Sequence, residues 1–260
     1  MLCGEIGDFL ANGVERLGRT VIEVANQAVR LSRTVDDLSM IRTEETFCSP
    51  EAGLALKEEE IVGLYGMRES GVRVIEFDFG NGPALVRFIE VPSHGSASSY
   101  TGVFADYLAV KTTVASVGVL RSAIEIPCGL CKCCRAKADK RVERAKSLPL
   151  YIILKELVLH GEAVHYIKPG PFTELSMATC FRALDVENGL LSLTDTLQGD
   201  RLDIDLRFIH MLHVNRSRRG SDDVSVLDLY DHQQQLLLRV ASTRPELAKR
   251  WMEICESVTR

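Results

Sequence analysis

Four cysteines lie within seven residues near the middle of the chain, and they are Cys128, Cys131, Cys133 and Cys134. The first two have the C-x2-C spacing that zinc sites use, and thiolates are good zinc ligands. A tetrahedral site usually takes its second pair from a separate segment, whereas Cys133 and Cys134 are adjacent here. The cluster therefore predicts one of three things: a zinc site of these four residues, a thiol pair for redox chemistry, or a linker without a chemical role.

A basic run surrounds and follows these cysteines. Lys132, Arg135 and Lys137 would lower the pKa values of neighbouring thiols and favour the thiolate form. Seven basic residues in all stand in this run against Asp139 and Glu143. Such a run is typical of a solvated helix face, and it can also attract an anionic ligand or partner.

Three residues outside the cluster have side chains suited to ligand binding. His94, in the run Pro-Ser-His-Gly, is either a solvated loop histidine or a metal ligand. Arg68 and Arg216 occupy equivalent positions in two similar stretches of sequence. Each is either a surface arginine beside a turn or a partner for a carboxylate. The choice depends on the elements that position these residues.

Two apolar-rich stretches with a polar turn in the middle, residues 72–91 and 224–242, are similar to each other. Each is predicted to be a β-hairpin, because strand-type residues flank a turn, which is Gly-Asn-Gly-Pro in the first copy. The aligned pairs are Val74 and Val226, Ile75 and Leu227, Glu76 and Asp228, Leu85 and Leu237, Val86 and Leu238, and Arg87 and Arg239. A helix predicted to end at Gly18 also recurs as one that ends at Gly161. This repeated order of elements indicates an internal duplication.

The predicted fold class is α+β, a tandem repeat of antiparallel β-sheet modules flanked by helices. The first repeat is expected to cover residues 1–114 and the second residues 147–260, with a cysteine-rich basic linker at 115–146. Residues 54–91 and 202–242 are predicted to form equivalent three-stranded antiparallel modules, each with a closing helix on one face.

Composition sets further limits. The 260 residues are 46% hydrophobic and 26% charged, which is typical of a soluble globular protein, and the net charge of −5 gives no reason to expect nucleic-acid binding. The longest apolar run is too short to cross a bilayer, and the acidic N-terminal stretch lacks the basic start of a secretory signal. We therefore expect a cytoplasmic protein with mostly reduced thiols. The sequence contains no phosphate-binding loop, nucleophile elbow or metalloprotease helix. This weakens the case for an enzyme without excluding one.

The second repeat carries a resemblance to a known family. Residues 199–242, followed by Pro-Glu-Leu-Ala-Lys-Arg-Trp, resemble the repeat of the HemS/ChuS-type hemin-transport and hemin-degrading proteins. In that repeat a strand ending in a basic residue leads through a turn into a hairpin and then a helix. Those proteins are tandem repeats of this module, so the resemblance covers both halves of the chain. It implies an α+β fold with heme held in a cleft between sheet and helices.

The resemblance also implies which residues could bind heme. In the family, a helical segment ahead of the second repeat carries the axial histidine in a His-Asp-Phe-Phe-like motif, and no such motif occurs here. His94, in the connection between the repeats, is the leading candidate for the axial donor and Cys128 is the reserve, since histidine and thiolate both ligate heme iron. Arg68 and Arg216 are the candidate partners of the heme propionates.

The function expected from the resemblance is heme binding and heme trafficking, with assistance in heme breakdown as a further role. Heme is then the cofactor, with zinc at the cysteines as the alternative cofactor. The expected partners are a heme oxygenase or heme-transport protein and a second copy of the chain. The rival hypothesis is a non-catalytic interaction or scaffold protein that has lost heme and uses the cysteine-rich segment for metal or partner binding. An active heme-degrading enzyme is the third possibility.

Overall fold

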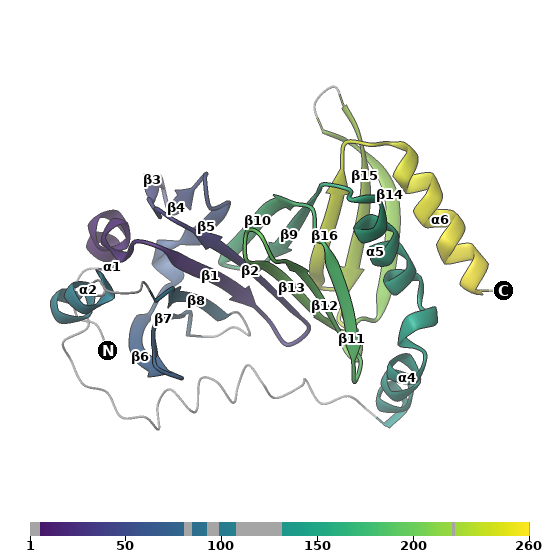
Figure 1. The fold of residues 1–260 in the computed structure, drawn as a ribbon, viewed down its shortest axis with the longest axis horizontal. Coiled ribbons are helices and arrows are strands. Elements are labelled where there is room, and N and C mark those ends of the chain that lie inside the picture. The colour runs from purple at the N-terminus through teal and green to yellow at the C-terminus, as the bar shows by residue number, and fades with distance from the viewer. Residues whose placement is uncertain (1–5, 81–84, 93–98, 108–131, 220–221, 260) are drawn as a thin grey trace. The chain divides into compact units, whose positions relative to one another are not determined.

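The fold is described from a computed structural model of the chain, which covers residues 6–80, 85–92, 99–107, 132–219 and 222–259 (Figure 1). Within these ranges, no helix is both long and apolar enough to cross a membrane.

The first repeat starts with three short helical segments in succession, α1 (Ile6–Asp8), η1 (Phe9–Gly13) and η2 (Val14–Leu17). Their apolar side chains are buried as the helical spacing predicts, namely Phe9, Leu10, Val14 and Leu17. The strands that follow are β1 (Thr20–Ala25), β2 (Val29–Val35), β3 (Ile41–Thr43), β4 (Thr46–Ser49), β5 (Leu54–Lys57), β6 (Gly63–Glu69), β7 (Val72–Asp78) and β8 (Leu85–Glu90). The turn η3 (Glu58–Glu60) lies between β5 and β6, and α2 (Ser99–Tyr107) follows β8.

The second repeat has the same order of elements. It starts with α5 (Pro149–His160), which is preceded by α4 (Lys132–Glu143) and the turn η4 (Ala145–Ser147) in the segment expected to be a linker. Its strands are β9 (Val164–Pro169), β10 (Thr173–Thr179), β11 (Ala183–Glu187), β12 (Leu190–Asp195), β13 (Asp200–Asp205), β14 (Met211–Arg219), β15 (Asp222–Tyr230) and β16 (Leu236–Ser242). The helix α6 (Glu246–Thr259) follows β16. Gly18 and Gly161 end the opening helices at φ values of +65° and +61°, which glycine adopts without strain.

The strands form two eight-stranded sheets, and each repeat contributes to both of them (Figure 1). One sheet has the order β11-β12-β13-β2-β1-β8-β7-β6, and the other has the order β14-β15-β16-β9-β10-β5-β4-β3. Each sheet therefore takes five strands from one repeat and three from the other. The predicted α+β class with duplicated antiparallel modules is confirmed.

The three-stranded modules β6-β7-β8 and β14-β15-β16 are antiparallel and have matching registers. Glu76 pairs with Arg87 across β7 and β8, and Asp228 pairs with Arg239 across β15 and β16, so residues that the sequence alignment matches occupy the same register in the two repeats. The closing helix α2 makes a polar contact with the sheet. The Tyr100 hydroxyl of α2 lies 3.0 Å from the Thr20 hydroxyl of β1.

The chain divides into two compact units that exchange short segments. Gln27–Leu31, at the start of β2, belongs to the unit that holds most of the second repeat. Gly170–Leu175, at the start of β10, belongs to the unit that holds most of the first repeat, and there Leu175 pairs with Leu54 of β5. These two segments follow the first strand of each repeat and thus occupy equivalent positions in the duplication.

Each unit has its own aromatic core. In the first unit, the ring of Phe77 lies 4.8 Å from that of Phe88 and 6.3 Å from that of Phe9. In the second unit, Tyr166 and Phe181 pack edge to face at 4.9 Å, and Trp251 of α6 is fully buried. Such edge-to-face pairs add to the stabilisation from apolar burial.

Candidate functional site

The two candidate arginines lie on the outer strands of the two sheets. Arg68 is in β6 opposite Arg73, and Arg216 is in β14 opposite Ser225, which are equivalent registers in the two repeats. Both side chains are exposed, and neither makes a hydrogen bond or ion pair with another residue that the structure describes. Because they lie in different units, the structure describes each cation on its own. Each is available to an anionic ligand.

The candidate axial donors fall outside the described residues. These donors are His94 and Cys128, and the same holds for Cys131 of the predicted zinc site. Their roles as ligands stay predictions. The other histidines of the chain, His160, His165, His210, His213 and His232, are all exposed.

The two remaining cysteines of the cluster, Cys133 and Cys134, lie in the first turn of α4. Cys133 is exposed and Cys134 is half-buried. Successive residues of an α-helix point about 100° apart, so these two thiols diverge from each other. Among the residues that the structure describes, no group of three or more His, Cys, Asp or Glu side chains is placed to hold a metal ion.

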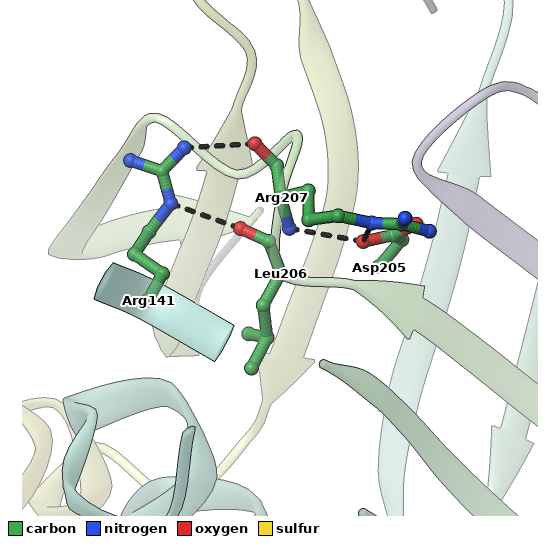
Figure 2. A network of polar contacts seen from close by, with 4 residues as sticks. All are labelled: Arg141, Asp205, Leu206 and Arg207. Carbon is green, nitrogen blue, oxygen red and sulfur yellow. Dashed lines mark hydrogen bonds and ion pairs between the residues drawn. The ribbon is translucent and has the colours of Figure 1, made fainter. Parts of the chain in front are cut away.

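Arg141, near the end of α4, attaches this helix to the loop that follows β13 (Figure 2). Its Nε donates to the carbonyl oxygen of Leu206 at 3.0 Å, and its Nη2 donates to that of Arg207 at 2.7 Å. Burial lowers the pKa of Arg141 from its ordinary value. In the same loop, Arg207 makes an ion pair with Asp205. The contacts of Arg141 hold α4 in a defined position, which the sequence pattern of a solvated basic helix did not predict.

A pocket of about 480 Å³ lies beside the end of α4, within the second unit. One wall is the chain from Val142 to Ser147, and the other is formed by Val186 of β11 and by Asn188 and Gly189 in the turn between β11 and β12. The main-chain N–H of Leu206 donates to the carbonyl oxygen of Gly189 at 2.9 Å. Leu206 also accepts a hydrogen bond from Arg141, so Leu206 connects the two walls.

The aligned acidic and basic residues of the hairpins form ion pairs in both repeats. In the first repeat, Nε of Arg87 lies 3.0 Å from Glu76, its Nη2 lies 2.9 Å from Glu69, and Glu23 lies 3.6 Å away. Burial by itself would lower the pKa of Arg87, but the hydrogen bond to Glu76 and the nearby carboxylates raise it above its ordinary value. The network therefore keeps a buried arginine charged and fixes the register of the strands around it.

The second repeat has a simpler pair at the same place. Arg239 binds both carboxylate oxygens of Asp228, at 2.7 and 2.9 Å, and the hydroxyl of Tyr230 donates to the same carboxylate. The Asp228 side chain is 2% exposed, whereas that of Arg239 is 42% exposed. This bidentate geometry is the strong form of a charge-assisted hydrogen bond.

Lys168, in β9, is a buried amine that the sequence interpretation did not single out. The residue is 1% exposed, and its Nζ donates one hydrogen bond of 2.7 Å, to the carbonyl oxygen of Pro169. Burial lowers the pKa of Lys168 to about 8. Ile167 pairs with Arg239 as Glu23 pairs with Arg87, so Lys168 takes the place of a valine in the first repeat. A lysine at an inward position of an alternating strand was the available signal.

Comparison with known proteins identifies the fold. Neither a protein-family model nor a curated protein sequence matches the chain. Among solved structures, the heme-degrading enzyme ChuS from Escherichia coli O157:H7 has a TM-score of 0.71 at 13% identity, over 97% of this chain and 85% of that one. A second structure of ChuS, described as an E. coli heme oxygenase, has a TM-score of 0.69 at 14% identity, over 100% of this chain and 88% of that one.

A structure from a second organism agrees with these. The heme-binding protein PhuS from Pseudomonas aeruginosa, without heme, has a TM-score of 0.68 at 12% identity, over 98% of this chain and 86% of that one. The likeness extends over both repeats, because each of these structures matches nearly the whole chain. The chain therefore has a fold of the HemS/ChuS type.

Proposed function

We propose that this protein binds heme and stores it or passes it on. The observation that supports the proposal most is the likeness to ChuS and PhuS over nearly the whole chain, since those proteins are described as heme-degrading and heme-binding. A fold alone does not determine a function, so the proposal also needs residues suited to heme.

An axial ligand and propionate partners are the two requirements. For the axial ligand we propose His94, with Cys128 as the reserve, because imidazole and thiolate are both competent donors to heme iron. For the propionates we propose Arg68 and Arg216. Their support is that each is exposed, is without a partner among the described residues, and sits at the same register in its repeat. A carboxylate bound by either guanidinium gains charge-assisted hydrogen bonds.

A hemin titration followed by absorption spectroscopy tests the proposal. A sharp Soret band that saturates at one hemin per chain is expected. His94→Ala should shift the Soret maximum and weaken affinity at least about tenfold, which corresponds to about 1.4 kcal/mol. His160→Ala is the matched control, because His160 is an exposed histidine at the end of α5, and it should leave the spectrum unchanged.

The outcomes distinguish the ligand assignment from heme binding itself. If His94→Ala, Cys128→Ala and the double variant all bind hemin as the parent does, the ligand assignment is wrong while heme binding stands. If the parent gives no saturable Soret band, heme binding is refuted. The scaffold hypothesis, with a metal or partner at the cysteine-rich segment, then takes its place.

The arginines require a separate experiment with hemin and its dimethyl ester, which lacks free carboxylates. Arg68→Gln and Arg216→Gln should each weaken hemin binding several-fold and leave binding of the ester unchanged. Arg135→Gln, which removes an exposed charge from α4, is the control. Equal effects of all three variants would show that only the net charge matters.

Transfer and breakdown of heme are separable in the same preparation. We propose that heme is passed to a heme oxygenase or a heme-transport protein, and that the free protein forms a homodimer. Loss of the Soret band in air with a reductant would assign breakdown to this chain. A stable Soret band, with loss of heme only when an acceptor protein is added, would assign storage and transfer.

A further inference from the structure

The pocket beside the end of α4 has the size of a ligand site. Its volume of about 480 Å³ falls within the range of roughly 300 to 1,000 Å³ that small-molecule sites occupy. It lies entirely within the second unit, and none of the candidate heme residues lines it. It is therefore a separate feature from the heme site proposed above.

The two walls of the pocket are held at a fixed distance. Asn188 and Gly189 form the tight turn between β11 and β12, with φ values of +49° and +83°. A Cβ atom at Gly189 would lie 2.6 Å from Cγ2 of Val142, so the close contact between turn and helix requires glycine. Leu206 connects the walls through its bonds to Gly189 and Arg141. A ligand would therefore meet a preformed surface, which reduces the cost of ordering on binding.

The charged side chains at the pocket favour an anion. Arg144 and Lys146 are exposed, and neither makes an ion pair with a residue that the structure describes. Glu143 is the one carboxylate among the lining residues, so the lining carries two positive charges against one negative charge. Arginine can bind a carboxylate or phosphate with two parallel hydrogen bonds, and lysine adds a second positive charge.

Other lining residues favour an apolar body attached to that anion. Val142, Ala145 and Val186 present aliphatic side chains to the pocket. The side-chain amide of Asn188 and the hydroxyl of Ser147 supply polar groups at its edge. We propose that this pocket binds a small organic anion, with a carboxylate or phosphate head held by Arg144 and Lys146 and an apolar body against the aliphatic side chains.

Amide NMR spectra of the full-length protein test the proposal with three probes: benzoate, phenyl phosphate and inorganic phosphate. Saturable shifts of the Asn188 and Gly189 amide signals are expected with an organic probe. Tighter binding of benzoate would assign a carboxylate, and tighter binding of phenyl phosphate would assign a phosphate ester. Inorganic phosphate should bind at least about fivefold more weakly than phenyl phosphate, because it has no apolar body. Binding of inorganic phosphate as tight as that of the better organic probe, or no saturable shift with any probe, would overturn the proposal.

Charge variants supply the matched control. The double variant Arg144→Gln/Lys146→Gln should weaken binding at least about tenfold. The double variant Arg135→Gln/Lys137→Gln removes the same charge from the neighbouring helix α4, at residues that do not line the pocket, and should change binding less than about twofold. Glu143→Gln should tighten binding about twofold or more, because it removes the opposing charge. Equal losses from both double variants would reduce the effect to general electrostatics and refute the site. Hemin affinity should be unchanged in all three variants.

Discussion

Replacing the buried Lys168 by methionine should stabilise the protein near neutral pH. Burial holds the pKa of this amine at about 8 against an ordinary value of 10.5, which corresponds to a cost of roughly 3 kcal/mol for the buried ammonium ion. Methionine has a similar length and no charge, but it loses the hydrogen bond to the carbonyl of Pro169, worth about 1 kcal/mol. The expected net gain in the free energy of unfolding is about 2 kcal/mol.

The pH dependence of this gain follows from the direction of the shift. Below about pH 8 the amine is protonated in both the folded and unfolded states, so the full cost is present. Between about pH 8 and 10.5 only the unfolded state binds the proton, and the stability of the parent rises with pH relative to the variant. The advantage of Lys168→Met should therefore shrink across this window and disappear before its upper end.

Urea unfolding, followed by the fluorescence of the single tryptophan, measures the effect. Trp251 is buried in the same unit as Lys168, so its emission reports the relevant transition. Lys155→Met is the control, because Lys155 is exposed on α5, and it should change stability by less than about 0.5 kcal/mol. A destabilised Lys168→Met variant, or a difference that is constant from about pH 7 to 10, would refute the reasoning. The charged amine would then be stabilised by its surroundings.

Three further predictions concern single features. Gly189→Ala should lower the free energy of unfolding by about 1 to 3 kcal/mol in thermal denaturation, because it combines a left-handed φ with a contact to Val142; an unchanged midpoint would contradict this. Arg239→Met should cost about 2 kcal/mol in urea unfolding by leaving the buried Asp228 carboxylate without its cation, and Arg239→Lys should recover part of that loss. Metal analysis of purified protein should find far less than one zinc per chain, because the thiols of residues 133 and 134 diverge; near-stoichiometric zinc, with loss of helix on chelation, would establish the zinc site.

The repeat was predictable because its signal lies in local patterns. Strand alternation and turn residues identify the hairpins. The matched positions include Glu76 with Asp228 and Arg87 with Arg239, and the strand registers agree with this alignment. Within each copy the acidic and the basic residue are neighbours across one hairpin. The partner strand of β5 could not be predicted. Its pairing with β10 joins residues from opposite repeats, and neither strand has a sequence pattern that indicates this partner.

The candidate site was predictable in part. The alignment places Arg68 and Arg216 at equivalent positions, and the registers agree. The basic run before the second repeat was predicted to be a solvated face, and most of it is exposed. Its attachment through Arg141 could not be predicted, because the acceptors are main-chain carbonyls and any residue has one. The pocket could not be predicted either, because it depends on how closely a turn approaches a helix, which the sequence pattern does not encode.

The exchange of strands between the repeats has a consequence for a chain cut in half. In either repeat alone, β2 or its counterpart β10 would lose its neighbour on one side, and so would β5 or its counterpart β13. Unpaired strand edges of this kind recruit complementary edges from other molecules. The missing edge of one half is the one that a second half offers, so two copies can satisfy each other around a twofold axis. The present chain thus has the connectivity of a strand-swapped dimer whose subunits have been joined into one polypeptide.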